Sequence, residues 1–314
     1  MKSFRIDDTA AASSGSIERA MLNASKRKRS RKDVQRRLDK MEETIATLQV
    51  VIEERSYNPR HHEAIVINEN GPHKERQIIK PDYFPEQIMH HVAVQALHPC
   101  IMHGMGAFVL GSIPGRGAHY GKRYIEKWLR HDEKNTRIIG KLDIRHFFQS
   151  VDHELLKAWI HKKIRPGKIR DLCDLIIEGV EEGLPLGFYT SQWFSNFLLQ
   201  PLDHFIMEEL HVSHMARYMD DIVIFGSNKK TIHAAMEAID FYLWNNFRLE
   251  MKKNWQVFRM EYVTTEYAIE CEKLGDLYAL HDALPVKHQL KMYKGRRKIF
   301  LKANARNEAV MDEY

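Results

Sequence analysis

The chain has 314 residues, of which 44% are hydrophobic and 29% charged, which is ordinary for a soluble globular protein of one or two domains. No apolar run approaches the roughly 20 residues of a membrane helix, and the first residues lack the apolar stretch of a secretory signal. Cys100, Cys173 and Cys271 lack the spacing of a disulfide framework or metal site. We therefore expect a cytoplasmic protein with no membrane partner.

Positive charge is concentrated near the N-terminus. The net charge is +6, but residues 26–37 hold eight basic residues and one acid and so carry +7, which leaves −1 for the rest of the chain. Such a block attracts a polyanion by releasing counterions from phosphates, whereas a solvated basic tail is the alternative interpretation. We expect nucleic acid to bind here, at Lys26, Arg27, Lys28 and Arg29.

The first half of the chain combines helical patterns with one hairpin. Residues 34–52 carry apolar residues at every third or fourth position, which predicts a helix. Residues 63–83 alternate apolar and polar side chains around an Asn-Gly pair, which predicts a β-hairpin. Residues 87–105 are typical of a buried helix, and residues 111–129 of a glycine-rich loop that leads into an amphipathic helix.

The second half mixes strands and helices. The expected strands cover residues 137–144, 216–226 with a tight turn, and 248–262. Helices are expected over residues 152–164, 169–180 and 230–246. Residues 183–210 are expected to form a loop that leads into a long helix, with Thr190 or Ser191 as its N-cap. Because helices surround an antiparallel hairpin, the expected fold class is α+β, with an antiparallel sheet packed on helices.

Acidic residues interrupt two of the apolar strands. Asp143 lies between Leu142 and Ile144, whose side chains point to the opposite face of the strand. Asp220 and Asp221 lie at the expected turn of residues 216–226. If the two strands are neighbours, three carboxylates converge and raise one another's pKa unless a divalent metal neutralises them. The alternative is an ordinary turn and an ordinary strand end.

Oxygen ligands of this kind favour Mg²⁺, which binds through a few carboxylates together with substrate phosphates. Two such ions can activate an attacking hydroxyl and stabilise a leaving pyrophosphate. This is the chemistry of a nucleic-acid polymerase. We therefore expect two Mg²⁺ ions, for which Mn²⁺ can substitute.

Three motifs together resemble the palm domain of reverse transcriptases. They are Tyr218-Met219-Asp220-Asp221 between apolar strands, Asp143 followed by Ile144, Arg145, His146, Phe147 and Phe148, and the loop Leu184-Pro185-Leu186-Gly187 before a helix. Their order and spacing match the family over about residues 57–258. The resemblance implies an RNA-directed DNA polymerase that uses an RNA template, a DNA or RNA primer and dNTPs.

The resemblance also implies roles for individual residues. It assigns Asp143 and Asp220 to the metals, with the Ile144 position beside them and Asp221 as supporting acid. Phe148 matches the steric gate that excludes a ribose 2′-hydroxyl, and Lys253 is the candidate general acid, with Lys252 as the alternative. The expected dNTP contacts are Lys74, Arg76, Phe148, Leu186, Gly187 and Gln192. The expected nucleic-acid contacts, besides the basic block, are Arg116, Tyr218 and Met219.

The domain boundaries expected from this resemblance are four. Residues 1–32 would be a disordered basic tail, residues 33–136 the fingers with an N-terminal helix, and residues 137–262 the palm. Residues 263–314 would be an atypical or truncated C-terminal segment, because no primer-grip motif follows Phe258. The thumb is therefore expected to be absent or rudimentary, and a basic accessory protein is a candidate partner.

The loop before the long helix separates subtypes of the family. Many members carry Gln-Gly followed by Ser-Pro, whereas this chain has Leu186-Gly187 followed by Ser191-Gln192. The pattern resembles the bacterial and phage reverse transcriptases of diversity-generating retroelements, which are similar to group II intron enzymes and copy RNA with errors at adenines. The alternatives are a phage-defence or domesticated bacterial reverse transcriptase, an intron maturase, and an RNA-binding protein that keeps the palm fold without catalysis.

Overall fold

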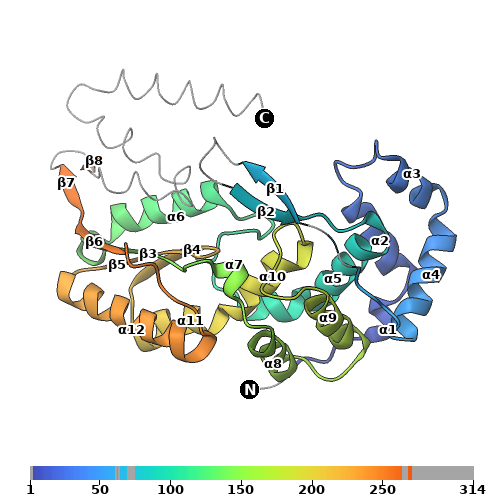
Figure 1. Cartoon of the computed structure of the whole chain (residues 1–314). Coiled ribbons are helices and arrows are strands. Elements are labelled where there is room, and N and C mark those ends of the chain that lie inside the picture. Colours follow the sequence, from blue (N-terminus) through green and yellow to red (C-terminus); the bar gives the residue numbers. More distant parts are fainter. Residues whose placement is uncertain (1–2, 61, 63, 69–74, 264–267, 271–314) are drawn as a thin grey trace. The chain divides into compact units, whose positions relative to one another are not determined.

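The computed structural model describes residues 3–60, 62, 64–68, 75–263 and 268–270 (Figure 1). The chain divides into two compact units. The first unit contains Met1–Met105, His146–Gln200 and Phe247–Leu249, and the second contains Gly106–Arg145, Pro201–Asn246 and Glu250–Tyr314. None of the described helices combines the length and the apolar character that a membrane span requires.

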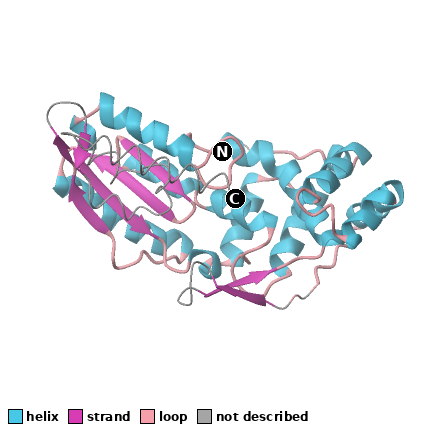
Figure 2. Cartoon of the chain, turned by 90° about the horizontal axis from the view of Figure 1, so that it is seen from above, coloured by secondary structure: helices cyan, strands magenta, loops and turns pink. Residues whose placement is uncertain are grey.

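A four-stranded antiparallel sheet forms the centre of the second unit (Figure 2). Its strands, in spatial order, are β4 (His214–Tyr218), β5 (Asp221–Gly226), β3 (Ile138–Asp143) and β6 (Gln256–Arg259). The three strand regions expected from the sequence are therefore confirmed, as is the mixed class of helices and antiparallel sheet. β3 lies between two strands and carries the apolar run that a central position requires.

Helices cover both faces of this sheet (Figure 1). On one face, α6 (Ala118–His131) packs Ile125 and Leu129 into a core that includes Ile139, Val223 and Phe225. On the other face lies α12 (Lys229–Phe247), and a Cβ on Gly140 would lie 2.9 Å from the Ile232 side chain. Gly140 thus allows this helix to approach the strand closely.

The first unit is mainly helical. Its central helix α5 (Ile88–His103) is buried on most sides and packs against four other α-helices of the unit. The helices of this unit are α1 (Asp8–Ala11), α2 (Ser14–Ala24), α3 (Lys32–Asp39), α4 (Met41–Glu53), the π-helical turn η1 (Tyr83–Gln87), α5, α7 (Phe147–Ser150), α8 (His153–Lys163), α9 (Lys168–Glu178) and α10 (Tyr189–Leu198).

The prediction of a disordered tail over residues 1–32 is wrong. The side chains of Ile17, Ala20 and Met21 on α2 are 0% exposed. Ser13 caps the helix, because its side chain accepts a hydrogen bond from the Ser16 N–H. The sequence did not predict this helix because its Ala and Ser residues give little contrast in hydrophobicity between the buried and exposed faces. Small residues can be buried by close packing without a strongly apolar side chain.

The predicted β-hairpin is confirmed. β1 (Ala64–Asn68) pairs with β2 (Glu75–Ile79) in antiparallel register. The turn, which includes Lys74, lies outside the described residues. The Ile79 N–H donates a 2.8 Å hydrogen bond to the Leu186 carbonyl, so that the hairpin is joined to the loop before α10.

The long helix expected after the loop of residues 183–210 is broken into α10, α11 (Gln200–His204) and the π-helical turn η3 (Phe205–Glu209). Phe188, rather than Thr190 or Ser191, is the N-cap of α10. In the second unit, a 3₁₀ turn η2 (Lys134–Thr136) precedes β3. Two short strands, β7 (Glu261–Val263) and β8 (Ala268–Glu270), pair directly after β6, where no hairpin motif was expected. Most of the segment predicted to be atypical, residues 263–314, lies outside the described residues.

Burial of a histidine makes the first unit sensitive to acid. Burial, together with the neighbouring His91, lowers the pKa of His90 on α5 to about 3. The folded protein therefore binds fewer protons than the unfolded chain below pH ~6.5. Stability from this group is fully present above that pH and decreases toward pH 3. We predict that the unfolding temperature of His90→Gln decreases less between pH 7 and pH 4 than the unfolding temperature of the wild type.

His98 provides the matched control, because it is an exposed histidine on the same helix. His98→Gln should follow the acid profile of the wild type. Equal acid sensitivity of His90→Gln and wild type would contradict the assignment.

Candidate active site

The three acids predicted from the sequence meet at one end of the sheet. Asp143 ends β3 and pairs in register with Asp221, which begins β5. Asp221 also pairs with Tyr218, which ends β4. Asp220 lies in the turn between β4 and β5, after Met219 at φ 56°, and its carbonyl accepts a 3.3 Å hydrogen bond from the Ile144 N–H. The register therefore brings the three carboxylates together.

Their charges are incompletely compensated by the protein. Burial, together with the charges of Asp143 and Asp220, raises the pKa of Asp221 to about 7. The Asp143 Oδ1 atom is buried without a hydrogen-bond partner. Such an orphaned carboxylate oxygen, next to a second acid that resists ionisation, fits a site for divalent cations. The donor set is all oxygen, as Mg²⁺ prefers.

Lys252 is the basic residue that contacts these acids. Its backbone N–H donates to the Asp143 carbonyl at 2.8 Å, and its Nζ lies 2.5 Å from the Asp143 Oδ2 atom. Lys253, the sequence-based candidate, is exposed in the following turn. An isolated antiparallel bridge between Ile144 and Met251 sets this one-residue difference, since it aligns Lys252 with Asp143. The alternative named from the sequence is therefore the residue that the structure brings to the acids.

A buried ion pair stabilises the turn between β4 and β5, and it was not predicted from the sequence. Arg217 on β4 is 0% exposed and donates through Nε and Nη2 to both carboxylate oxygens of Asp203 on α11, each at 2.7 Å. Its Nη1 also donates to the Met219 carbonyl at 3.1 Å. The pair thus connects α11 to the backbone immediately before Asp220. A charged residue between apolar neighbours of a strand was the available signal.

Three predicted nucleic-acid contacts are engaged within the protein. The Arg116 Nη1 atom donates to the carbonyls of Gly106 and Val109 at 2.5 and 3.0 Å, so this guanidinium stabilises its own loop. Met219 is 7% exposed and Tyr218 is half-buried against the sheet core. Their contacts with nucleic acid remain predictions.

The predicted nucleotide contacts lie in the first unit. Gly187 has φ 107°, and a Cβ there would lie 2.1 Å from the Ile79 carbonyl oxygen, so only glycine fits against β2. A cavity of about 560 Å³ lies between the hairpin and this loop, and Gln77, Ile79 and Leu186 are among its lining residues. Phe148 is half-buried, Gln192 is exposed, and neither lines the cavity. Arg76 lies on β2 of the same hairpin.

The basic block begins on the turns after α2 and continues into α3. Lys26, Arg27 and Arg29 are exposed, as a nucleic-acid contact requires. Lys28 differs, because its Nζ donates to the Gln87 Oε1 atom at 2.5 Å. Burial lowers the pKa of Lys28, with Arg31 contributing. Lys28 therefore has a structural contact that the charge count did not show.

The buried ion pair gives a stability prediction. Asp203→Asn removes the charge that balances Arg217 and leaves a buried cation, so we expect a loss of about 3–5 kcal/mol in the free energy of unfolding. Denaturant unfolding measures this loss. The control is Glu250→Gln, which breaks the exposed ion pair with Arg145 and should cost about 0–1 kcal/mol. Equal losses in the two variants would contradict the role given to Asp203.

Comparison with known proteins agrees with this geometry. Residues 67–273 match the family described as "Reverse transcriptase (RNA-dependent DNA polymerase)". Among solved structures, an apo telomerase from Candida tropicalis, truncated from its C-terminal domain, shares 14% identity at a TM-score of 0.45 over 68% of this chain and 54% of its own. A telomerase from Candida albicans, in complex with a fragment of telomeric RNA, shares 13% identity at a TM-score of 0.46 over 66% and 44%.

The chain thus spans about half the length of these telomerase chains. No curated protein matches it significantly. The family match covers about two thirds of the chain and includes all three acids at the end of the sheet. The chain belongs to the reverse transcriptase family, the RNA-dependent DNA polymerases.

Proposed function

We propose that this protein extends a DNA or RNA primer with dNTPs on an RNA template. The observation that carries this proposal is the convergence of Asp143, Asp220 and Asp221 at the end of the sheet, with a buried, unpartnered oxygen on Asp143. In this proposal Asp143 and Asp220 hold two Mg²⁺ ions, with the Ile144 position beside them, and Asp221 is the supporting acid. Mn²⁺ can substitute.

When bound, the two ions would lower the pKa of the primer hydroxyl and neutralise charge on the leaving pyrophosphate. The protein's own contribution is to hold the acids in place. The β3–β5 register and the Arg217 contact with Met219 fix the backbone on either side of Asp220. Lys252 is then placed to donate a proton to the pyrophosphate, because its ammonium already lies against Asp143. We prefer it to Lys253 for this role.

Nucleotide selection is assigned to the first unit, as a proposal. Lys74 and Arg76 of the hairpin would bind the triphosphate, and Phe148 would exclude a ribose 2′-hydroxyl. Leu186, Gly187 and Gln192 would contact the nucleotide from the loop before α10. Support comes from the bond between Ile79 and Leu186, which couples the hairpin to that loop.

The same proposal names the macromolecular partners. The exposed Lys26, Arg27 and Arg29 suit an RNA backbone, with Arg116, Tyr218 and Met219 as further candidates. A basic accessory protein is a further candidate partner. The proposed setting is the cytoplasm of a bacterial host, with the gene on the chromosome or on a phage. In family terms, residues 33–136 would act as fingers and residues 137–262 as palm.

The subtype we propose is that of diversity-generating retroelements. Leu186 supports it, because an apolar side chain at this position cannot hydrogen-bond the nucleotide. A phage-defence enzyme or a maturase would share the three acids. A gene neighbourhood with a template repeat and a variable target gene would distinguish a diversity-generating retroelement from them. A non-catalytic RNA-binding protein is disfavoured, because such a protein has no need of three converging carboxylates.

The assigned chemistry predicts a specific loss of activity. In primer extension on an RNA template with Mg²⁺ and dNTPs, Asp220→Ala should lower the rate by at least about 100-fold, since it removes a proposed metal ligand. Glu237→Ala, an exposed acid on α12, should retain the rate of the wild type. Equal extension by Asp220→Ala and wild type would refute the chemistry.

The subtype predicts a change in fidelity. Leu186→Gln restores a hydrogen-bonding side chain, so we expect several-fold fewer misincorporations opposite template adenine. Sequencing of the cDNA product measures the errors, and the error rates opposite the other three template bases serve as the internal control. An unchanged adenine error rate would sink the role of Leu186.

A further inference from the structure

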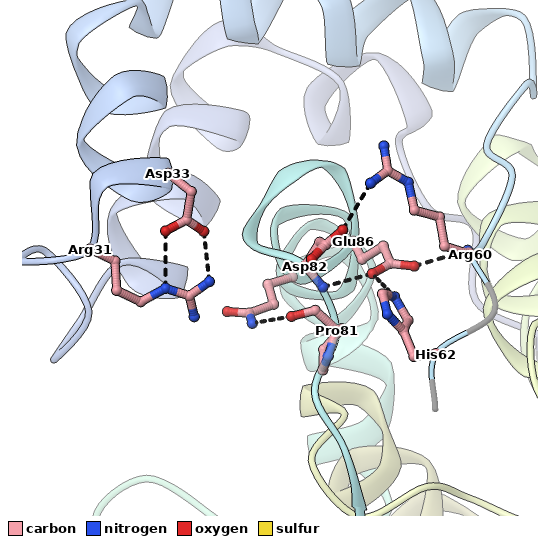
Figure 3. A network of polar contacts seen from close by, with 8 residues as sticks. Arg31, Asp33, Arg60, His62, Pro81, Asp82 and Glu86 are labelled. Atoms are coloured by element: carbon pink, nitrogen blue, oxygen red, sulfur yellow. Dashed lines mark hydrogen bonds and ion pairs between the residues drawn. The ribbon is translucent and has the colours of Figure 1, made fainter. Parts of the chain in front are cut away.

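Three potential metal ligands lie together in the first unit, away from the acids of the sheet in sequence (Figure 3). His62 precedes β1, whereas Asp82 and Glu86 follow β2. One ligand atom from each residue lies within 4.8 Å of the other two. Because Ala64 pairs with Ile79, this cluster lies at the open end of the hairpin.

Glu86 is a buried acid that contacts both His62 and the backbone around it. The residue is 1% exposed, and its carboxylate accepts hydrogen bonds from the Arg60 and Asp82 backbone N–H groups at 2.9 and 2.8 Å. Its Oε2 atom lies 2.5 Å from the His62 Nε2 atom. Arg60 Nη1 contacts Asp82 at 2.8 Å, but its side chain is 60% exposed. The exposed Arg60 guanidinium thus contacts Asp82, whereas Glu86 is contacted by the Arg60 backbone and by His62.

A separate observation concerns the hydroxyl of Tyr57. Tyr57 is 5% exposed, and its hydroxyl is buried without a hydrogen-bond partner. Burial raises the pKa of Tyr57, and the charge of Glu86 raises it further, so the hydroxyl lies within electrostatic range of that carboxylate. Buried hydroxyls in folded proteins are nearly always paired. A bound ion or its water would give this one a partner.

We propose that His62, Asp82 and Glu86 bind a Zn²⁺ ion. One imidazole nitrogen with two carboxylate oxygens suits zinc, whereas Mg²⁺ and Ca²⁺ prefer oxygen alone. Asp82 engages Arg60 through Oδ2, which leaves Oδ1 as a ligand. Binding replaces the direct His62–Glu86 contact with two bonds to the ion. A water in the fourth position would lie toward the Tyr57 hydroxyl.

The ion would act on the hairpin. It joins His62, which precedes β1, to Asp82 and Glu86, which follow β2, and so connects the two strands at the open end of the hairpin. The same strand β2 contacts the Leu186 loop through Ile79. Zinc would therefore stabilise the segment that carries Arg76. The binding itself does not rest on the proposed polymerase activity, and only this consequence for the hairpin does.

Zinc titration of the full-length chain tests the site. The Asp220→Ala variant serves as parent, so that the acids of the sheet contribute less. Calorimetry with Zn²⁺ should show a saturable site in the parent. The affinity of that site should be at least about tenfold weaker in His62→Ala and Glu86→Gln, so that the site is lost from their titrations. Zinc should also raise the unfolding temperature of the parent but not of His62→Ala. His204→Ala is the matched control, because it breaks an exposed His–Glu pair.

Two results would overturn the proposal. Identical zinc stoichiometry and affinity in the parent and His62→Ala would place the ion elsewhere. Absence of saturable binding in the parent would mean that Arg60 and His62 neutralise the acids unaided. His62→Ala decides the matter if Glu86→Gln fails to fold, since His62 is only partly buried. Primer extension by the wild type is measured separately, so failure of the zinc site leaves the polymerase proposal intact.

Discussion

The register between β3 and β5 is the constraint on which the second unit depends. It pairs Asp143 with Asp221 and thereby holds like charges together that would separate in an unconstrained chain. The pK shift of Asp221 to about 7 reflects this arrangement. The apolar core behind the acids, with α6 on one face and α12 on the other, supplies the burial that opposes the repulsion. The apolar core thus stabilises the sheet, whereas the acids at one end of the sheet repel one another.

The ion pair of Arg217 and Asp203 explains how the turn that carries Asp220 keeps its conformation. A buried pair with two 2.7 Å hydrogen bonds adds little net stability over apolar packing, but it fixes direction. Its third contact, to the Met219 carbonyl, holds the residue with φ 56° that turns the chain before Asp220. The geometry of the acids therefore depends on a residue that carries no ligand atom itself.

Local patterns predicted the strands, the hairpin and the three acids, because alternation and interrupted apolar runs are visible within a few residues. Relations between distant segments were not predictable in this way. Choosing Lys252 over Lys253 requires the bridge from Ile144 to Met251, and recognising Arg217 requires α11. The helix α2 was missed because alanine and serine give little contrast between its buried and exposed faces.

The hairpin of the first unit contrasts with the sheet of the second. Ile65, Val66 and Ile67 on β1 are 39% to 53% exposed, so burial of apolar surface contributes little to its position. Two of its described attachments are polar, namely the bond from Ile79 to Leu186 and the cluster around Glu86, and the half-buried Ile78 adds an apolar contact near Gly187. A segment held by few polar contacts opens at low free-energy cost. Binding a cation at the base or a triphosphate along the strand would each reduce that freedom, and for this reason the two events should favour each other.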